Sequence, residues 1–152
     1  MNKRAAALGA VFLCALLFTT FQTYAGEAKN TTWQIISDVD EMLKNNPMPA
    51  GEKSQMIKLA EDDTVSVYLI RMLEGASLGP HFHKSHDEIE YVIRGTGKLL
   101  VQGKWVEMKP GTFHFNPAMN VHGSQNTGNE PLVVLIMFTP AMKETDRHFQ
   151  SQ

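Results

Sequence analysis

Cysteine is almost missing from this chain: Cys14 is the only one among its 152 residues. Without a second thiol the protein can form no internal disulfide, so its stability must come from a hydrophobic core. A metal site, if the chain has one, must be built from histidine and carboxylate side chains. The chain also has no internal repeat and no low-complexity tract, and its length supports one domain rather than two.

An excess of basic residues is also missing, since 14 lysine and arginine residues stand against 16 aspartate and glutamate residues. Two of the basic residues, Lys3 and Arg4, lie within the first 25 residues, which contain no acidic residue. Without that segment the chain would have 12 basic and 16 acidic residues, a net charge of −4. A mildly acidic domain without a basic stripe is not expected to bind nucleic acid.

The first 25 residues have the order of a secretory signal peptide. A basic start is followed by the almost unbroken apolar run Ala5–Phe18, and Thr23-Tyr24-Ala25 has small residues at the two positions that a signal peptidase reads. We therefore predict cleavage after Ala25 and a periplasmic or secreted protein without stable membrane insertion. The mature protein would contain no cysteine. The alternative is a retained membrane anchor, because the apolar run is nearly long enough to span a bilayer.

Residues 26–60 are expected to form an N-terminal arm and a short helix. Ser37 is a good helix N-cap, and the acidic residues at positions 38, 40 and 41 favour a first turn. Val39, Met42 and Leu43 recur at helical spacing, and Asn45-Asn46-Pro47 ends the run. Because this helix offers one apolar stripe and solvated charges, we expect it to pack on the domain or cover it rather than take part in chemistry.

Residues 61–140 are expected to form an all-β barrel, and the strand-like pattern begins as early as Ser54. Short strand-like segments are separated by turns at 56–59, 64–73, 88–94, 97–102, 104–108, 112–116 and 132–138. Many short strands with frequent turns are typical of a sandwich or a small barrel. Gln102-Gly103 predicts a tight hairpin turn. The polar residues 141–152 are expected to form a loosely held tail.

The most specific chemical signal comes from four residues: His81, His83, Glu88 and His122. Alternate residues of a strand point to the same face, so His81 and His83 direct both imidazoles one way. Three imidazoles and one carboxylate that converge on one point suit a divalent transition metal. A single buried histidine is usually a hydrogen-bonded core residue, but four unpaired polar groups inside a small barrel would be costly without a metal.

The spacing around these residues resembles the two motifs of the cupin superfamily. The first motif is matched without a gap by Gly75, His81, His83, Glu88 and Gly95. The second motif is matched by Gly111, Pro117, His122 and Asn126. The resemblance covers about residues 62–140, and the short segment between the motifs is typical of small single-domain cupins.

The resemblance implies a double-stranded β-helix, or jelly-roll barrel, with a metal ion held in its interior by His81, His83, Glu88 and His122. Cupins of this size commonly pair through an edge strand, so we expect a homodimer. An N-terminal arm such as residues 27–36 could add to the sheet of the partner. One position departs from the pattern, because Met119 stands where cupins usually have a glycine. Either the turn after Pro117 has an unusual geometry or its φ is negative and methionine is tolerated. Met119 either reaches the mouth of the pocket or lies on the surface.

Strand parity identifies one further candidate, since Glu90 should face the same interior as Glu88. Glu90 is a candidate general base; the alternatives are a structural ion pair with a lysine or arginine, or a strand twist that turns it outward. His114 is a candidate for contact with substrate, although a structural role is preferred. His86 is expected to be exposed in a loop, and His148 to belong to the tail. The barrel walls are expected to be filled by Phe82, Phe113, Phe115, Met72 and Met137.

Three nitrogens and one carboxylate do not select one metal, and iron, manganese, nickel, copper, cobalt and zinc all accept this ligand set. On a six-coordinate ion they leave two open positions, enough for a small chelating molecule. We therefore predict an exported metal-dependent enzyme, a dioxygenase, isomerase or lyase that acts on a small oxygen-rich molecule. The alternative is a module that binds or senses a metal or small ligand without turnover, because a fold does not fix a function.

Overall fold

The computed structural model describes residues 38–142 and 145–150. The predicted signal peptide, Ser37 and the arm 27–36 lie outside these residues. The part of the chain that the structure describes contains no helix long and apolar enough to cross a membrane.

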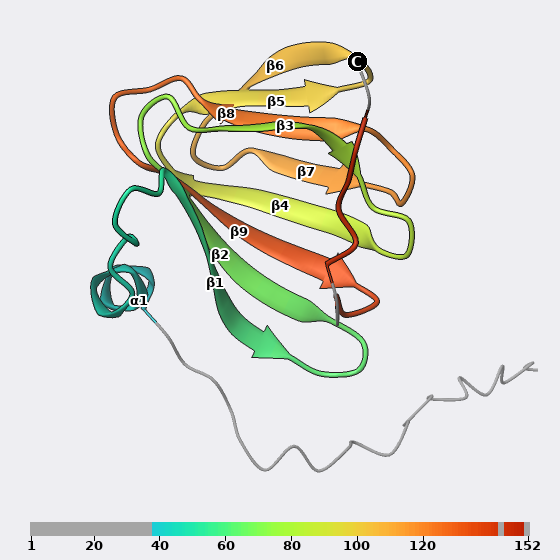
Figure 1. Ribbon diagram of the computed structural model, residues 1–152, viewed down its shortest axis with the longest axis horizontal. Helices are drawn as coiled ribbons and strands as arrows, with labels where there is room; N and C mark the ends of the chain where they lie inside the picture. The colour runs from blue at the N-terminus through green and yellow to red at the C-terminus, as the bar shows by residue number, and fades with distance from the viewer. Residues whose placement is uncertain (1–37, 143–144, 151–152) are drawn as a thin grey trace, which may run out of the picture. The chain divides into compact units, whose positions relative to one another are not determined.

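Two five-stranded antiparallel sheets face each other and form a double-stranded β-helix, as predicted (Figure 1). The first sheet has the order β1-β2-β9-β4-β7, with strands Ser54–Glu61, Ser66–Met72, Leu132–Thr139, Asp87–Arg94 and Phe113–Asn116. The second has the order β10-β3-β8-β5-β6, with strands His148–Phe149, Ser77–Phe82, His122–Asn126, Gly97–Val101 and Lys104–Met108. β1 is paired along its length with β2, so the sheet extends before residue 61.

Local sequence accounts for the sharpest turns. The β5–β6 hairpin pairs Val101 with Lys104 and reverses through Gln102 and Gly103, whose φ angles are 50° and 76°. Two positive φ values are what a two-residue hairpin turn requires, so the predicted turn is confirmed. Gly95 has a φ of 79°, and a Cβ atom there would lie 2.6 Å from the carbonyl oxygen of Pro131. Glycine is therefore needed at this position for two independent reasons.

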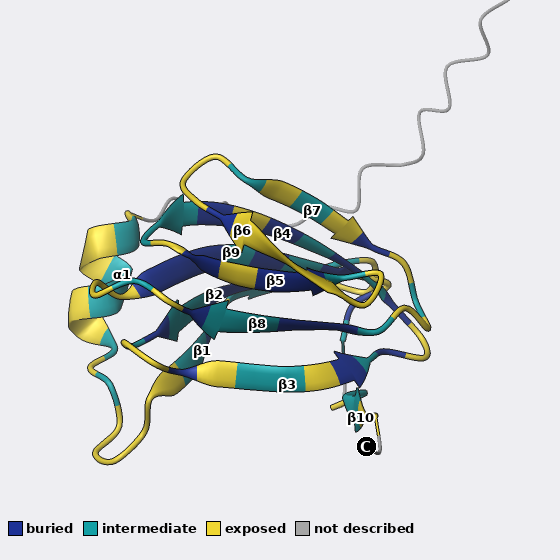
Figure 2. Cartoon of the chain, turned by 90° about the horizontal axis from the view of Figure 1, so that it is seen from above, coloured by how far each residue is buried: buried dark blue, intermediate teal, exposed yellow. Residues whose placement is uncertain are grey.

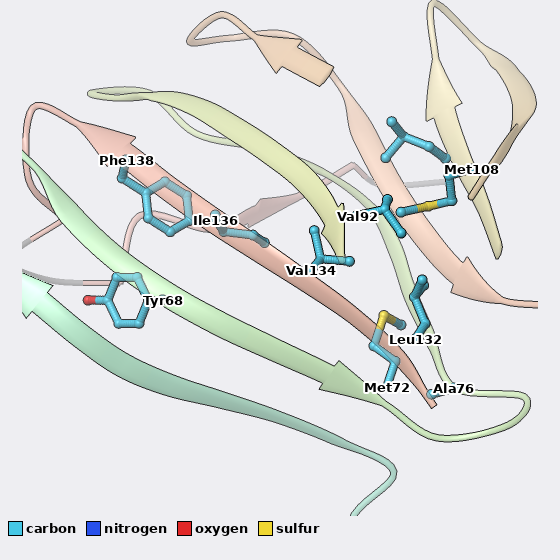
Figure 3. Close-up of a cluster of buried hydrophobic side chains, with 10 residues drawn as sticks. Tyr68, Met72, Ala76, Val92, Met108, Leu132, Val134, Ile136 and Phe138 are labelled. Atoms are coloured by element: carbon cyan, nitrogen blue, oxygen red, sulfur yellow. The ribbon is translucent and has the colours of Figure 1, made fainter. Parts of the chain in front are cut away.

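The core lies between the two sheets and is made by the inward faces of both (Figure 3). Tyr68 on β2 meets Phe138 on β9 edge to face, with ring centroids 5.8 Å apart. Met72 is buried, as predicted. Further buried members are Ala76, Val92, Leu99, Met108, Leu132, Val134 and Ile136. Burial of such apolar surface is the main stabilising contribution in a chain without disulfides.

The helix α1, Val39–Asn45, packs on the outer face of the first sheet. Its apolar residues Val39, Met42 and Leu43 contact a second buried cluster formed by Ile57, Leu69 and Val133. The packing role is therefore confirmed. Ser37 was predicted as the N-cap, but Asp38 occupies that position, because its carboxylate accepts hydrogen bonds from the amides of Asp40 and Glu41 at 2.9 and 3.1 Å. The shorter start leaves Asp40 and Glu41 in the first turn.

The prediction that Phe113 and Phe115 fill the barrel wall is wrong, since they are 64% and 48% exposed. β7 lies at the edge of its sheet, and its inward face carries His114 and Asn116 instead. Tyr91, which pairs with Phe113 across β4 and β7, is also 44% exposed. Phe82 and Met137 are half-buried.

The prediction of a loosely held tail is also wrong for the residues that the structure describes. His148 and Phe149 form β10, which pairs with Phe82 and His81 at the end of β3. The C-terminal segment therefore crosses the strand ends at the side opposite α1, as Figures 1 and 2 show. This side of the barrel contains the candidate site.

Candidate metal centre

The four predicted ligands meet inside the barrel, at the end that the C-terminal segment covers. His81 lies near the end of β3, Glu88 near the start of β4 and His122 at the start of β8, and His83 directly follows β3. Their exposed fractions are between 1% and 4%. One ligand atom from each of the four lies within 4.8 Å of the others. These four residues, called the metal group from here on, could hold a metal ion.

The three imidazoles are oriented by main-chain oxygens. The Nδ1 atom of His81 lies 2.9 Å from the carbonyl oxygen of Gly79, and that of His83 lies 2.9 Å from the carbonyl oxygen of Asp146. The Nδ1 atom of His122 lies 3.1 Å from the carbonyl oxygen of Asn120 and also contacts the side-chain amide of Asn116. A carbonyl oxygen only accepts, so Nδ1 of His81 and of His83 carries the proton and Nε2 keeps a free lone pair for a metal. The Asn120 carbonyl favours the same tautomer for His122, which requires the Asn116 amide to turn its oxygen toward Nδ1.

The Nε2 atoms of His83 and His122 and the Oε2 atom of Glu88 are buried without a hydrogen-bond partner. His122 Nε2 lies 2.6 Å from Glu88 Oε2, and His83 Nε2 lies 3.3 Å from the same oxygen. A neutral imidazole protonated at Nδ1 presents only a lone pair at Nε2, so neither contact is then a hydrogen bond despite the short distances. Buried polar atoms without partners are costly, and a cation among these three atoms and His81 would satisfy them together.

The electrostatics of the group suit metal binding. Burial, with the charge of His122 as a second cause, lowers the pKa of His81 to about 4, so this imidazole is neutral at pH 7. Burial alone would raise the pKa of Glu88, but His122 and His83 outweigh burial and lower it, so the carboxylate is charged. Burial lowers the pKa of His122, yet Glu88 outweighs burial and raises it. Because metal ligands must be deprotonated, metal uptake would release a proton from this pair.

A cavity of about 220 Å³ opens beside three of the four candidate ligands, His81, Glu88 and His122. This volume equals roughly seven water molecules and is below the roughly 300–1,000 Å³ of sites for drug-sized ligands. Most of its wall is apolar and consists of Met56, Ile70, Met72, Leu78, Val134, Ile136 and Phe138. The polar members of the wall outside the four candidate ligands are Ser54, Gln55, Glu90, Ser124 and Arg147. The cavity therefore suits a small ligand that has both apolar surface and polar groups.

Glu90 faces this cavity and is 5% exposed, so the parity prediction of its direction is confirmed. Its Oε2 atom lies 2.9 Å from Nδ1 of His114, the residue directly opposite on β7. The partner is thus a histidine and not a lysine or arginine. Burial raises the pKa of Glu90, partly offset by His114 and reinforced by Glu88. A raised pKa suits a carboxylate that exchanges protons near neutral pH.

The loop between His83 and Glu88 is fixed by a residue that the sequence analysis did not single out. The carboxylate of Asp146 accepts hydrogen bonds from the amides of Lys84 and Ser85, both at 2.8 Å, and from the Ser85 hydroxyl at 2.7 Å. The prediction that His86 is exposed is wrong: it is 5% exposed, with Nε2 3.4 Å from the same carboxylate. His148, predicted as tail, also contacts Asp146 at 2.8 Å. Charged and aromatic residues at 146–149 were the only sequence signal for this arrangement.

Met119 has a φ of 70°, so the chain adopts here the left-handed conformation that glycine favours. The second of the two alternatives for this turn, a negative φ, is therefore wrong. The side chain is 60% exposed and does not line the cavity, so it lies on the surface. The Met119 amide donates a hydrogen bond of 2.6 Å to the carbonyl oxygen of His83. The turn is therefore joined to a residue of the metal group.

Replacing Met119 by glycine is expected to stabilise the fold by about 1 kcal/mol, because it removes the cost of a Cβ atom at positive φ. Thermal and denaturant unfolding of Met119→Gly would measure the gain. Met119→Ala is the matched control, since it shortens the side chain and keeps the Cβ atom. Equal stabilisation by the two variants would mean that the backbone conformation is not the cause.

Comparison with known proteins identifies the family. A model of the cupin domain matches residues 68–138. An uncharacterized protein of Aquifex aeolicus is 32% identical over 111 residues, which cover 73% of this chain and 88% of that protein. The chain belongs to the cupin superfamily.

Other relatives share part of the cupin barrel. Glucose-6-phosphate isomerase of Thermococcus onnurineus is 40% identical over 65 residues, which cover 38% of this cupin and 34% of that enzyme. The match thus spans about a third of the isomerase. A solved structure from Klebsiella pneumoniae, an uncharacterized conserved protein with a double-stranded β-helix domain, superimposes with a TM-score of 0.66 at 20% identity. The superposition covers 79% of this cupin and all of that chain. At 20% identity it supports the fold and not a function.

Proposed function

We propose that this cupin is a metal-dependent enzyme that acts on a small, oxygen-rich molecule able to chelate the ion. One observation carries the proposal: three buried histidines have Nδ1 beside carbonyl oxygens, and the Nε2 atoms of His83 and His122 lie unpaired beside the buried carboxylate of Glu88. His81, His83, Glu88 and His122 would hold a single divalent transition metal ion, which when bound would polarise an oxygen of the substrate. Export after cleavage near Ala25 and assembly as a homodimer belong to the same proposal.

Glu90 favours an enzyme over a binding module. It lies in the cavity wall, is not a member of the metal group, and has a pKa raised by burial. Its carboxylate would accept a proton from the substrate and return it, while His114 fixes Oε2 in position. Transfer of a proton next to a carbonyl group is isomerase or lyase chemistry. The partial likeness to glucose-6-phosphate isomerases supports this reaction class.

Elemental analysis of the native exported protein, and of protein dialysed with each candidate metal, tests the metal proposal. We expect one ion per chain, retained through gel filtration. Failure to retain any of iron, manganese, nickel, copper, cobalt or zinc would overturn the proposal. The same samples, analysed by sedimentation, test the homodimer: a monomer at micromolar concentration would contradict it.

Glu90→Gln is expected to retain the metal and to lose at least about 100-fold in proton-transfer activity, because glutamine cannot act as a base. The measurement is deuterium incorporation from solvent into hydroxyketones such as dihydroxyacetone and fructose 6-phosphate. Glu107→Gln, which changes an exposed glutamate on β6, is the matched control. Equal exchange by Glu90→Gln and the control would exclude Glu90 as the base. Tight ligand binding without exchange in the unmodified protein would favour a binding module.

A further inference from the structure

Arg147 is a cationic residue of the cavity that the metal group does not use. It lies in the C-terminal segment between Asp146 and β10, and it lines the cavity together with His81, Glu88 and Glu90. The same cavity wall includes His122, so Arg147 shares it with three of the four candidate ligands. A positive charge thus stands beside the position of the ion.

The guanidinium of Arg147 lacks the acceptors that the other arginines in the described ranges have. Arg71 donates to the carbonyl oxygens of Leu43 and Asn46, and Arg94 forms an ion pair with Asp40. The Nε atoms of Arg71 and Arg147 are both buried without a hydrogen-bond partner, but Arg71 donates through its terminal nitrogens, whereas the Arg147 guanidinium has no such bond to another described residue. A buried donor on a charged group is costly when it has no acceptor. An acceptor supplied by a ligand would remove that cost.

The segment that carries Arg147 is held on both sides. Asp146 before it is fixed to the loop after His83, and His148 after it is paired with Phe82 on β3. The main chain at Arg147 is therefore fixed before a ligand arrives. A side chain on a fixed main chain binds an anion with a smaller loss of conformational entropy than one on a mobile segment.

The charges of the cavity also favour an anion. Glu88 and Glu90 supply two negative charges at most, and a divalent ion with Arg147 supplies three positive charges. A loaded site would therefore have a net positive charge in a low-dielectric interior, where a matching anion is bound most strongly. A planar guanidinium can also donate two parallel hydrogen bonds to a carboxylate or a phosphate.

We propose that Arg147 binds an oxyanion, a carboxylate or a phosphate, carried by the small molecule whose other end chelates the metal. This inference rests on the proposed metal function and specifies its substrate class: a compact anionic molecule that fits about 220 Å³. Arg147 is thus a specificity-determining residue, and the C-terminal segment supplies both a wall of the site and its anion contact.

The test uses manganese-loaded protein and three probes that share a chelating 2-hydroxycarboxylate: lactate, malate and 3-phosphoglycerate. Malate adds a distal carboxylate to this group, and 3-phosphoglycerate adds a distal phosphate. By calorimetric titration we expect at least one of the two to bind about tenfold or more tightly than lactate. Whichever of malate and 3-phosphoglycerate binds more tightly identifies the anion as a carboxylate or a phosphate. Arg147→Gln should remove the preference and leave lactate binding and metal content unchanged.

Arg94→Gln is the matched control, because it removes an arginine that pairs with Asp40 outside the cavity. Equal affinity for all three probes in the unmodified protein, or a preference that survives Arg147→Gln, would overturn the inference while the metal site stands. Should Arg147→Gln fail to fold, Arg147→Lys provides the test, because it keeps the charge and loses the two parallel donors of the guanidinium. This variant must still weaken the preference for malate or 3-phosphoglycerate over lactate.

Loss of the metal function would be seen separately, as absence of manganese from unmodified protein. Phosphate titration of the metal-free protein then tests Arg147 alone. Binding that Arg147→Gln abolishes would support an anion site, and no difference between the two proteins would overturn it.

Discussion

Replacement of His122 by alanine is expected to lower the affinity for the metal by at least about 100-fold, because it removes one of four ligands. His122 Nε2 is the histidine nitrogen nearest to Glu88, at 2.6 Å, so its loss also leaves that buried carboxylate without its main counter-charge. At a metal concentration a thousandfold above the dissociation constant, binding stabilises the folded state by about 4 kcal/mol. The unmodified protein should therefore melt roughly 10–20 °C higher with metal than without it.

His122→Ala should lose this metal-dependent shift, which differential scanning calorimetry with and without manganese measures. His114→Asn is the matched control, since His114 contacts Glu90 and is not a member of the metal group. A shift in His122→Ala as large as that of the control would show that the ion binds elsewhere.

Replacement of Asp146 by alanine is expected to destabilise the fold by about 4 kcal/mol. Its carboxylate, 14% exposed, accepts three hydrogen bonds from the loop after His83, and bonds to a charged acceptor contribute about 1.5–3 kcal/mol each without full additivity. Denaturant unfolding measures the loss, and amide hydrogen exchange should show that β10 and residues 84–85 lose protection together. Asp40→Asn, which breaks an exposed ion pair with Arg94, should cost less than about 1 kcal/mol.

The effect of Asp146 should depend on pH in a defined direction. Burial would raise the pKa of its carboxyl group, but hydrogen bonds from Ser85, His148 and Lys84 outweigh burial and hold the pKa well below its usual range. A lowered pKa in the folded state stabilises the protein above the ordinary value near 4, and this contribution is lost as the pH falls toward the folded-state value. The stability difference between Asp146→Asn and the unmodified protein should therefore be constant from about pH 6 to 8 and shrink below about pH 5. A difference that grows on acidification would contradict this assignment.

The sequence was sufficient for features that local spacing determines. The Gln102-Gly103 turn follows from the conformations that a two-residue hairpin requires, and the inward direction of Glu90 follows from strand parity. The grouping of His81, His83, Glu88 and His122 followed from the resemblance to two spaced motifs. These predictions are confirmed because they depend on few residues each, or on a pattern shared by a family.

Features that depend on contacts between distant segments were missed. Asp146 meets Lys84 across 62 positions, and no local pattern reports such a pairing. The same contact buries His86, which a loop position alone suggests is exposed. Phe113 and Phe115 alternate as a strand should, but only the register of β7 against β4 determines that they face outward. Tertiary context decided all three, as it often does for strands.

The acceptors behind the three imidazoles are main-chain oxygens, those of Gly79, Asp146 and Asn120. Side-chain substitution at those positions cannot delete the acceptor atoms themselves, provided that the backbone keeps its course. The apolar wall made by Met56, Ile70 and Ile136 is contributed by other residues. Directed evolution could therefore vary the wall widely to reshape substrate choice while the imidazole tautomers stay the same. The orientation of the metal ligands is, in this sense, mutationally robust.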